Sequence, residues 1–506
     1  MAGSLAKERL TAGPGFNRWL IPPAALAIHL SIGQAYAFSV FNLPLSKVLG
    51  VTAPASGDWK LTDLGWVFTL AIVFLGLSAA VFGRWLEDAG PRKSGLAAAA
   101  CWGTGFLVGA LGVRTHQLWL LLLGYGVIGG CGLGLGYITP VSTLIKWFPD
   151  RRGMATGLAI MGFGGGAMIA APLSTALMHR FAGPGTVGVA ETFVVLGLIY
   201  FVAMALGALA FRLPAAGWRP AGYVAPSVPR PLISRHDVHP RDAIRTPQFW
   251  LLWAVLCLNV TAGIGVLGQA SPMIQEVFHG RIDAAAAAGF VGLLSLFNMS
   301  GRFFWSSLSD RIGRKATYAT FFTLGALLYA AVPFAGRIGS IALFVACFAV
   351  ILTMYGGGFA TIPAYLSDLF GIRYVGAIHG RLLTAWSAAG VFGPVLVNYI
   401  RQYEIDRGVP TAQAYNYTLY LMAGLLLVGL ICNFAVTPVG ARHYLAEGDV
   451  LPEPERPAGD RSTVAGSLSP TAGAGAVLAV AWTAVGAPLA WGITSTIQRA
   501  LALFRH

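Results

Sequence analysis

Long apolar runs alternate with short polar segments along most of this 506-residue chain. A helix needs about 20 mostly apolar residues to cross the hydrocarbon core of a bilayer. Runs of about that length fall at 19–41, 63–85, 94–113, 117–145, 154–177, 190–211, 248–274, 284–308, 316–335, 338–366, 376–400 and 414–436. The pattern predicts an all-α membrane protein with twelve transmembrane helices.

A further apolar run at 471–496 suggests a thirteenth helix near the C-terminus. Polar segments divide the runs into two groups of six and this extra one. The expected division is an N-terminal segment at 1–18, six-helix bundles at 19–211 and 246–436, linkers at 212–245 and 437–470, and an extra transmembrane helix at 471–497.

Lysine and arginine gather in alternate loops, and their distribution predicts the orientation. The richer loops hold Arg84, Arg92 and Lys93; Lys146, Arg151 and Arg152; six arginines between 212 and 245; and Arg311, Arg314 and Lys315. By the positive-inside rule, the N-terminus and the central linker are cytoplasmic. We therefore expect a multi-pass membrane protein whose N-terminus lies in the cytoplasm.

The composition agrees with a membrane protein and argues against several other classes. Hydrophobic residues make up 56% of the chain and charged residues 11%, against about a quarter charged in soluble proteins. The net charge of +14 lies in loops, where topology requires it, so we expect no nucleic-acid partner. The sequence shows no metal-ligand spacing and no Ser-His-Asp set, so we expect neither a metal, a cofactor nor an enzyme.

Three landmarks recur along the chain and predict two related halves. Leu86-Glu87-Asp88 reappears as Leu308-Ser309-Asp310 (88 to 310, an offset of 222), Pro140…Gly153 as Pro363…Gly376 (140 to 363, an offset of 223), and Gly33-Gln34-Ala35 as Gly268-Gln269-Ala270 (33 to 268, an offset of 235). Six plus six helices in related halves are typical of rocker-type transporters, which bind substrate between the halves near mid-membrane.

Arg302 is the main candidate for a functional residue. It lies eight residues before Asp310, which marks the membrane edge, so it is about 12 Å deep in a core about 30 Å thick. Asn298 and Ser295 lie one and nearly two turns earlier on the same helix face. Every Asp and Glu falls in a loop or at the end of a run. A deep cation without an internal anion suggests that the anion is the substrate; the alternative is a structural arginine bonded to carbonyl groups.

Several motifs resemble those of a known family. Gly83…Asp88…Gly90…Arg92-Lys93 and Gly301…Asp310…Gly313-Arg314-Lys315 look like the loop motif of the major facilitator superfamily. Tyr137–Gly164, with its Lys-Trp-Phe-Pro-Asp-Arg-Arg-Gly segment, and Tyr355–Pro363 resemble the oxalate/formate antiporter family within it. The resemblance covers about residues 17–440 and implies the major facilitator fold and a transport function.

The resemblance also implies a substrate site. In this family and in the similar monocarboxylate transporters, an arginine of the eighth helix binds the substrate carboxylate, and Arg302 matches it. Oxalate-specific members carry a lysine in helix eleven, where this chain has Trp386. One cavity cation suits one carboxylate. Arg381 is either a second substrate cation or a gate residue that bonds carbonyl groups or a loop acid.

Polar residues on the helices that line the cavity in this superfamily complete the candidate site. They are Tyr36, Tyr137, Tyr355, Asn298, Gln34 and Gln269. Each tyrosine could instead be a packing residue, and each glutamine could find its partner outside the cavity. Asp88, Arg92, Asp310 and Arg314, at the cytoplasmic ends, are expected to act in gating rather than in binding.

These features favour a secondary transporter of small monocarboxylates such as lactate, pyruvate, glycolate or formate, working as a monomer in the lipid bilayer. Asn298 stands where proton-coupled monocarboxylate transporters place an acid, which favours exchange of one carboxylate for another. Proton symport through His29, read as the one histidine clearly inside a run, is the weaker option. The alternatives are an oxalate/formate antiporter and a membrane carboxylate sensor or scaffold.

Overall fold

The computed structural model describes residues 10–13, 15–215, 217–220, 223, 232–234, 236–445 and 472–501. Outside this range lie 1–9 and 14 of the expected N-terminal segment and 216, 221–222, 224–231 and 235 of the expected central linker. Residues 446–470 of the second expected linker, and 471 at the start of the expected extra helix, lie outside it as well. Within it the chain is all-helical, as the apolar pattern predicts, and twelve helices are long and apolar enough to cross a membrane. Those twelve include the C-terminal helix α17 (Ala472–Ala500) but not α11 (Ala284–Ile312), which packs among them and carries Arg302.

The N-terminal bundle contains six membrane-crossing units. They are α1 (Ile21–Ile32) continued by η4 (Gly33–Phe41) and α2 (Asn42–Leu45); α3 (Leu61–Ala89); α4 (Pro91–Arg114); α5 (Leu118–Leu121) continued by η5 (Leu122–Gly129) and α6 (Gly130–Trp147); α7 (Arg152–Phe181); and α8 (Val189–Ala210). A short 3-10 turn, η3 (Arg18–Leu20), precedes α1.

The C-terminal bundle repeats this plan. Its elements are α10 (Pro247–Val277), α11 (Ala284–Ile312), α12 (Arg314–Arg337), α13 (Ile341–Phe370), α14 (Val375–Leu382) continued by α15 (Thr384–Asp406), and α16 (Asn416–Ala435). The short helix α9 (Pro240–Ala243) belongs to the central linker, and the turns η6 (Thr411–Gln413) and η7 (Ala441–His443) flank α16.

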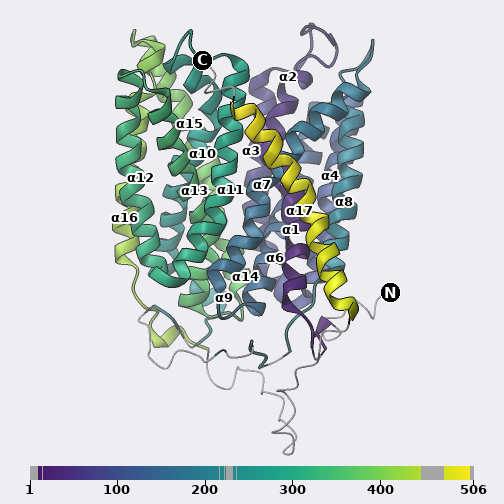
Figure 1. Cartoon of the computed structure of the whole chain (residues 1–506), viewed down its shortest axis with the longest axis vertical. Coiled ribbons are helices and arrows are strands. Elements are labelled where there is room, and N and C mark those ends of the chain that lie inside the picture. Colours follow the sequence, from purple (N-terminus) through teal and green to yellow (C-terminus); the bar gives the residue numbers. More distant parts are fainter. Residues whose placement is uncertain are drawn as a thin grey trace, which may run out of the picture.

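The two bundles lie side by side, with the purple and blue N-terminal helices beside the green C-terminal ones (Figure 1). They meet mainly where α7 packs on α11 and α13, and where α3 packs on α14 and α15. We call the end of the bundles that carries α9 the linker side and the opposite end the far side. The core of each bundle is apolar, so charges inside the interface stand out.

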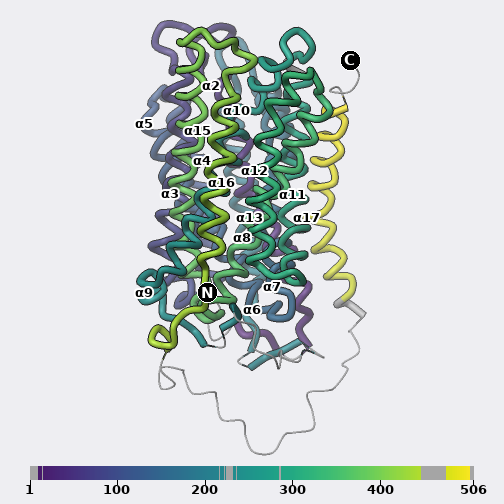
Figure 2. Tube along the Cα trace, turned by 90° about the vertical axis from the view of Figure 1, so that its left-hand side faces the viewer, coloured from purple at the N-terminus to yellow at the C-terminus, as the bar shows by residue number. Residues whose placement is uncertain are grey.

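The helix α17 runs obliquely from the linker side to the far side, outside both bundles (Figures 1 and 2). It packs on α1 and α7 of the N-terminal bundle and on α11 of the C-terminal bundle. The extra helix expected from the sequence is therefore present, and it lies along the seam between the halves.

Candidate functional site

Arg302 is fully buried at the interface between the bundles. Its Nε donates a hydrogen bond to Asn298 Oδ1 at 3.1 Å, one turn earlier on α11, and its Nη1 donates to the carbonyl oxygen of Ile160 on α7 at 3.3 Å. Its Nη2 has no hydrogen-bond partner. Among the described residues no carboxylate pairs with it. The guanidinium thus has only neutral partners.

Aromatic faces and glycines shape the space around this cation. The Arg302 guanidinium carbon lies 5.7 Å from the ring centre of Phe163 on α7 and 5.3 Å from that of Phe359 on α13. Gly164 lets α7 approach, since a Cβ there would lie 2.9 Å from Arg302 Nε. Gly356 does the same from α13, where a Cβ would lie 3.0 Å from Arg302 Cγ. Cation–π attraction partly replaces the lost hydration of the guanidinium.

The three tyrosines and the tryptophan expected at the site gather around the same two phenylalanines. Tyr36 from η4 and Tyr355 from α13 join their hydroxyl groups at 3.1 Å across the two bundles. Trp386 of α15 packs 5.4 Å from Tyr137 of α6, between ring centres. Trp386 also lies 5.3 Å from Phe163 and 4.4 Å from Phe359. The Tyr137 hydroxyl and Trp386 Nε1 are buried and have no hydrogen-bond partner.

Of the two repeat-related glutamines, the structure places Gln34 outside this cluster. Gln34 is buried inside the N-terminal bundle, where its Oε1 accepts a hydrogen bond from Tyr125 at 2.9 Å. Tyr125 in turn packs against Trp102 and Phe106, so Gln34 points away from Arg302. Gln269 is half-buried on α10. Because Gln34 lies inside an apolar run, its side chain needs a hydrogen-bond partner. The hydropathy pattern does not show toward which neighbouring helix that side chain points.

Two histidines lie near Tyr137, and the sequence interpretation recognised one of them. His29 is fully buried, with Nδ1 2.6 Å from the Ala159 carbonyl oxygen and Nε2 3.2 Å from the Tyr137 carbonyl oxygen. His379 of α14 lies 5.9 Å from the Tyr137 ring, and neither of its ring nitrogens has a partner. The expectation that His29 alone lies clearly inside a run is therefore corrected, because α14 continues into α15 as one span.

The linker side is closed by capping bonds that cross between the bundles. On one side Asp310 accepts hydrogen bonds at 2.9 Å from the backbone N–H groups of Gly153 and Met154, at the start of α7. On the other, Glu87 accepts one at 3.0 Å from the N–H of Gly376, at the start of α14. A carboxylate at a helix N-terminus is favourable because the helix dipole and free N–H groups face it.

Glu87 therefore takes the place that the sequence analysis gave to Asp88. The step from 87 to 310 is 223 residues, the same as the step from Gly153 to Gly376. Asp88 is exposed, since one residue along a helix turns a side chain by about 100°. Gly90 and Gly313 are 223 residues apart as well, and both have positive φ, 83° and 89°. Glycine allows that conformation without steric cost.

Further ion pairs strengthen these caps. Arg314 donates from Nη2 to Asp310 at 2.7 Å and from Nε to Asp368 of α13 at 3.0 Å. Arg152 of α7 reaches the same Asp368 at 3.2 Å, across the interface. Glu87 also pairs with Lys146 at 2.5 Å. We call Glu87, Lys146, Arg152, Asp310, Arg314 and Asp368 the linker-side latch.

Arg92 and Arg381, also expected to act in gating, make hydrogen bonds to backbone carbonyl groups outside the latch. The Nε of Arg92 donates to the carbonyl oxygen of Phe211, at the end of α8, at 3.1 Å. Lys315 makes the matching bond to Phe434 O, at the end of α16, at 2.8 Å. Arg381 donates to the carbonyl oxygen of Pro240 in the linker. The bonds to Phe211 and Phe434 each join helix ends within one bundle, whereas the Arg381 bond ties α14 to the central linker.

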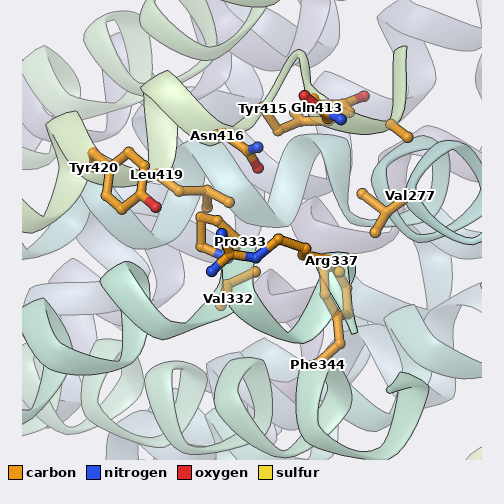
Figure 3. A pocket seen from close by; sticks show the side chains of 12 residues that line it. Val277, Val332, Pro333, Arg337, Phe344, Gln413, Tyr415, Asn416, Leu419 and Tyr420 are labelled. Carbon is orange, nitrogen blue, oxygen red and sulfur yellow. The ribbon is translucent and has the colours of Figure 1, made fainter. Parts of the chain in front are cut away.

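Two cavities on the far side differ in their relation to the site. One of about 390 Å³ lies between α10, α12, α13 and the start of α16 and includes Arg337 and Tyr415 (Figure 3). It contains no residue of the Arg302 cluster. The other, of about 290 Å³, is lined by Tyr36, Ser295 and residues of α17, and it therefore adjoins the cluster through Tyr36.

The fold and sequence relatives agree on the class of protein. A family described as the Major Facilitator Superfamily matches residues 15–394 and 300–504. The oxalate:formate antiporter of Oxalobacter formigenes is 28% identical over 381 residues, covering 74% of this chain and 83% of that protein. Apicoplast pyruvate carrier 1 of Toxoplasma gondii is 24% identical over 437 residues, covering 76% and 77%. The E. coli fucose:proton symporter FucP has the same fold, with a TM-score of 0.60 at 14% identity, covering 84% of this chain and all of that one.

Proposed function

Because this chain belongs to the Major Facilitator Superfamily, whose matched relatives are transporters, we propose that it moves small monocarboxylates across the membrane by alternating access. Lactate, pyruvate, glycolate and formate are the candidate substrates. The observation that carries the proposal is a buried arginine with only neutral partners among the described residues.

The chemistry of the cluster suits one carboxylate. A guanidinium presents a planar fork of donors that can bind both carboxylate oxygens. Arg302 Nη2, the Tyr137 hydroxyl and Trp386 Nε1 are buried donors without partners, which is unfavourable unless something else accepts their hydrogen bonds. Phe163, Phe359 and the indole of Trp386 form an apolar wall around the rest of a short substrate. The proposed pose pairs the carboxylate with Arg302 and places the alkyl group against these rings.

Transport of a dicarboxylate such as oxalate is the second candidate, favoured by the likeness to an oxalate:formate antiporter. It would be expected to use a second cation close to Arg302. Arg381 is bonded to the Pro240 carbonyl group in the linker, and Trp386 occupies the position where a lysine would stand. A single central cation among the described residues therefore favours the monocarboxylate.

Competition between substrates separates these two candidates. In proteoliposomes loaded with unlabelled lactate, uptake of labelled lactate should be inhibited by pyruvate or glycolate at lower concentrations than by oxalate. Stronger inhibition by oxalate than by every monocarboxylate would reverse the order of the two proposals.

We also propose that transport is an obligatory exchange. An empty site leaves Arg302 charged without a counter-charge, and closing the bundles around a bare cation is costly. A bound carboxylate removes that cost, so the loaded protein changes conformation more easily than the empty one. The latch would close the linker side in one state, and the Tyr36–Tyr355 hydrogen bond would close the path to Arg302 from the far side.

His29 offers a route to proton coupling that competes with this proposal. Both of its ring nitrogens face carbonyl oxygens, and a neutral imidazole has one N–H with which to bond them. A protonated ring would donate to both. Comparing counterflow with net uptake decides between the two mechanisms. Exchange predicts fast counterflow and little net uptake under a pH gradient, unchanged in His29→Gln. Strong gradient-driven accumulation that His29→Gln abolishes would contradict it.

The orientation and domain division remain part of the proposal. We place the linker side in the cytoplasm of a bacterial cell, with bundles at 19–211 and 246–436 and a monomer as the working unit. The basic residues of the latch support this side, as the positive-inside rule requires. A cysteine introduced at Ser234 in the linker should react with a membrane-impermeant reagent after cell lysis and not in intact spheroplasts; the reverse would invert the topology.

A further inference from the structure

The helix α17 is closely fitted to both bundles. Gly289 of α11 faces its last turn, where a Cβ would lie 2.6 Å from the Arg499 carbonyl oxygen. Gly165 of α7 faces Leu489, and a Cβ there would lie 3.0 Å from its side chain. From α17 itself, Gly492 approaches the backbone of Met168 on α7, 3.1 Å from an added Cβ. Glycines at such contacts allow helix backbones to approach closely, so α17 has a defined position along the interface between the two bundles.

In this position α17 forms one wall of the cavity of about 290 Å³ on the far side. η4 and α7 line it from the N-terminal bundle, α10 and α11 from the C-terminal bundle, and α17 from outside. The polar lining consists of Tyr36, Ser39, Ser271, Ser295 and three residues of α17, Ser495, Thr496 and Arg499. Arg499 is the one charged residue among those that line the cavity. Hydroxyl groups and one cation are a suitable environment for a small anion.

Tyr36 belongs both to the cavity wall and to the Arg302 cluster. The Tyr36 hydroxyl is bonded to Tyr355 at 3.1 Å. Tyr355 packs 5.3 Å from Phe359, between ring centres, and Phe359 lies over the Arg302 guanidinium. The Tyr36–Tyr355 hydrogen bond is therefore one of the contacts between the cavity and the central cation, together with the packing of Tyr36 on Phe163, whose ring centres lie 4.9 Å apart. Two of the lining residues, Ser39 and Arg499, are exposed.

We infer that this cavity is an entry site for the carboxylate, which α17 completes and where Arg499 attracts the anion before the Tyr36–Tyr355 contact opens. The inference rests on the proposed function for the identity of the anion, but not for the presence of the site. A cation at the mouth of a low-dielectric cavity raises the local concentration of anions and the rate of their association. The attraction should weaken with salt, because the screening length is about 8 Å at 0.15 M ionic strength.

Transport kinetics of the full chain give the first test, with Arg499→Gln, Arg499→Lys and the control Arg337→Gln. Arg337 is an exposed arginine on the same far side that does not line this cavity. We expect Arg499→Gln to raise KM for lactate exchange about 3- to 10-fold at low salt and to leave kcat nearly unchanged. The effect should shrink in salt of about 1 M, where the screening length falls to about 3 Å. Arg499→Lys should keep a KM close to that of the wild type. An equal rise in Arg337→Gln would show a general surface effect and overturn the inference.

A second test needs no substrate and so separates the cavity from the transport proposal. Ser295→Cys places a thiol in the cavity wall, and its reaction is followed with an anionic and a cationic methanethiosulfonate reagent, with the parent protein as background. We expect the anionic reagent to be favoured, and Arg499→Gln to lower the anionic-to-cationic rate ratio at least about 3-fold. An unchanged ratio, or a thiol that neither reagent reaches, would overturn the inference even if lactate exchange is observed.

Discussion

Arg302 and Arg314 are two buried arginines twelve residues apart in sequence (302 to 314), and they have opposite surroundings. Arg314, whose side chain is 9% exposed, binds Asp310 and Asp368 at 2.7 and 3.0 Å. Arg302, fully buried, binds an amide oxygen and a backbone carbonyl group and keeps one nitrogen unpartnered. Both lie at the interface between bundles. One cation has its anions built into the chain, and the other does not.

This difference separates closing from binding. The latch balances its charges internally, so it can hold the linker side shut without a ligand. Arg302 has only neutral partners among the described residues, and under the proposed function a substrate anion would balance its charge. A transporter needs both arrangements, since the closed side must be stable while the substrate site must discriminate loaded from empty. The following changes test that assignment.

The largest effect is expected from removing the central cation. Arg302→Ala should lower exchange by roughly 10³-fold, corresponding to about 4 kcal/mol for a buried charge contact to the substrate. Arg302→Lys should recover little, because an ammonium group lacks the bidentate fork. The measurement is initial exchange in proteoliposomes, with Arg245→Ala, an exposed linker arginine, as control. Wild-type exchange by Arg302→Ala would remove Arg302 from the site.

Removing the latch cation should instead reduce stability. Arg314→Ala leaves Asp310 and Asp368 with less compensation, and breaking a buried pair in this way costs about 3 kcal/mol or more. We expect purified Arg314→Ala to have a lower Tm than purified Arg302→Ala, because Arg302→Ala leaves no internal carboxylate unpaired. If Arg302→Ala lowers Tm more than Arg314→Ala, the contrast between the two sites is wrong.

Giving the centre an internal acid should make it resemble the latch. Asn298→Asp places a carboxylate where the amide oxygen lies 3.1 Å from Arg302 Nε. The new carboxylate competes with substrate, so we expect affinity to fall about 10-fold or more. Net uptake under a pH gradient should increase relative to counterflow, because the empty site can now be neutral. Isothermal titration calorimetry with lactate measures the affinity, and paired flux assays compare net uptake with counterflow. An unchanged affinity would argue that substrate does not bind at Arg302.

The smallest effect concerns the corrected cap. Glu87→Gln should weaken the closed linker side by about 1–2 kcal/mol, because its charge-assisted bonds to Gly376 and Lys146 become weaker. Asp88→Asn makes the matching change on the exposed neighbour and should have no effect. The readout is the alkylation rate of Thr156→Cys, a position that is buried at the interface. Faster alkylation with Asp88→Asn than with Glu87→Gln would restore the original assignment.

Some features of the site could be predicted from single positions and others could not. Arg302, Asn298, Tyr36, Tyr137, Tyr355 and Trp386 were identified from depth in a run and from family motifs, and the structure places them in one cluster. Phe163 and Phe359 were missed because phenylalanines abound in every apolar run. Glu87 could have been found from the repeat, because it precedes Asp310 by 223 residues, the same offset that relates Gly153 to Gly376 and Gly90 to Gly313. Gln34 was misplaced because hydropathy does not show which way a buried polar residue points.

The sequence by itself determined the number of spans, the twofold repeat and the depth of the unpaired cation, because these depend on hydropathy, spacing and helix rise along one chain. Only the tertiary structure decided which faces meet. It turned Glu87 rather than Asp88 toward α14, directed Gln34 into its own bundle, and seated α17 against both halves. Those outcomes depend on the rotation of each helix about its axis and on close packing between helices far apart in sequence, and a difference of one residue is enough to reverse them.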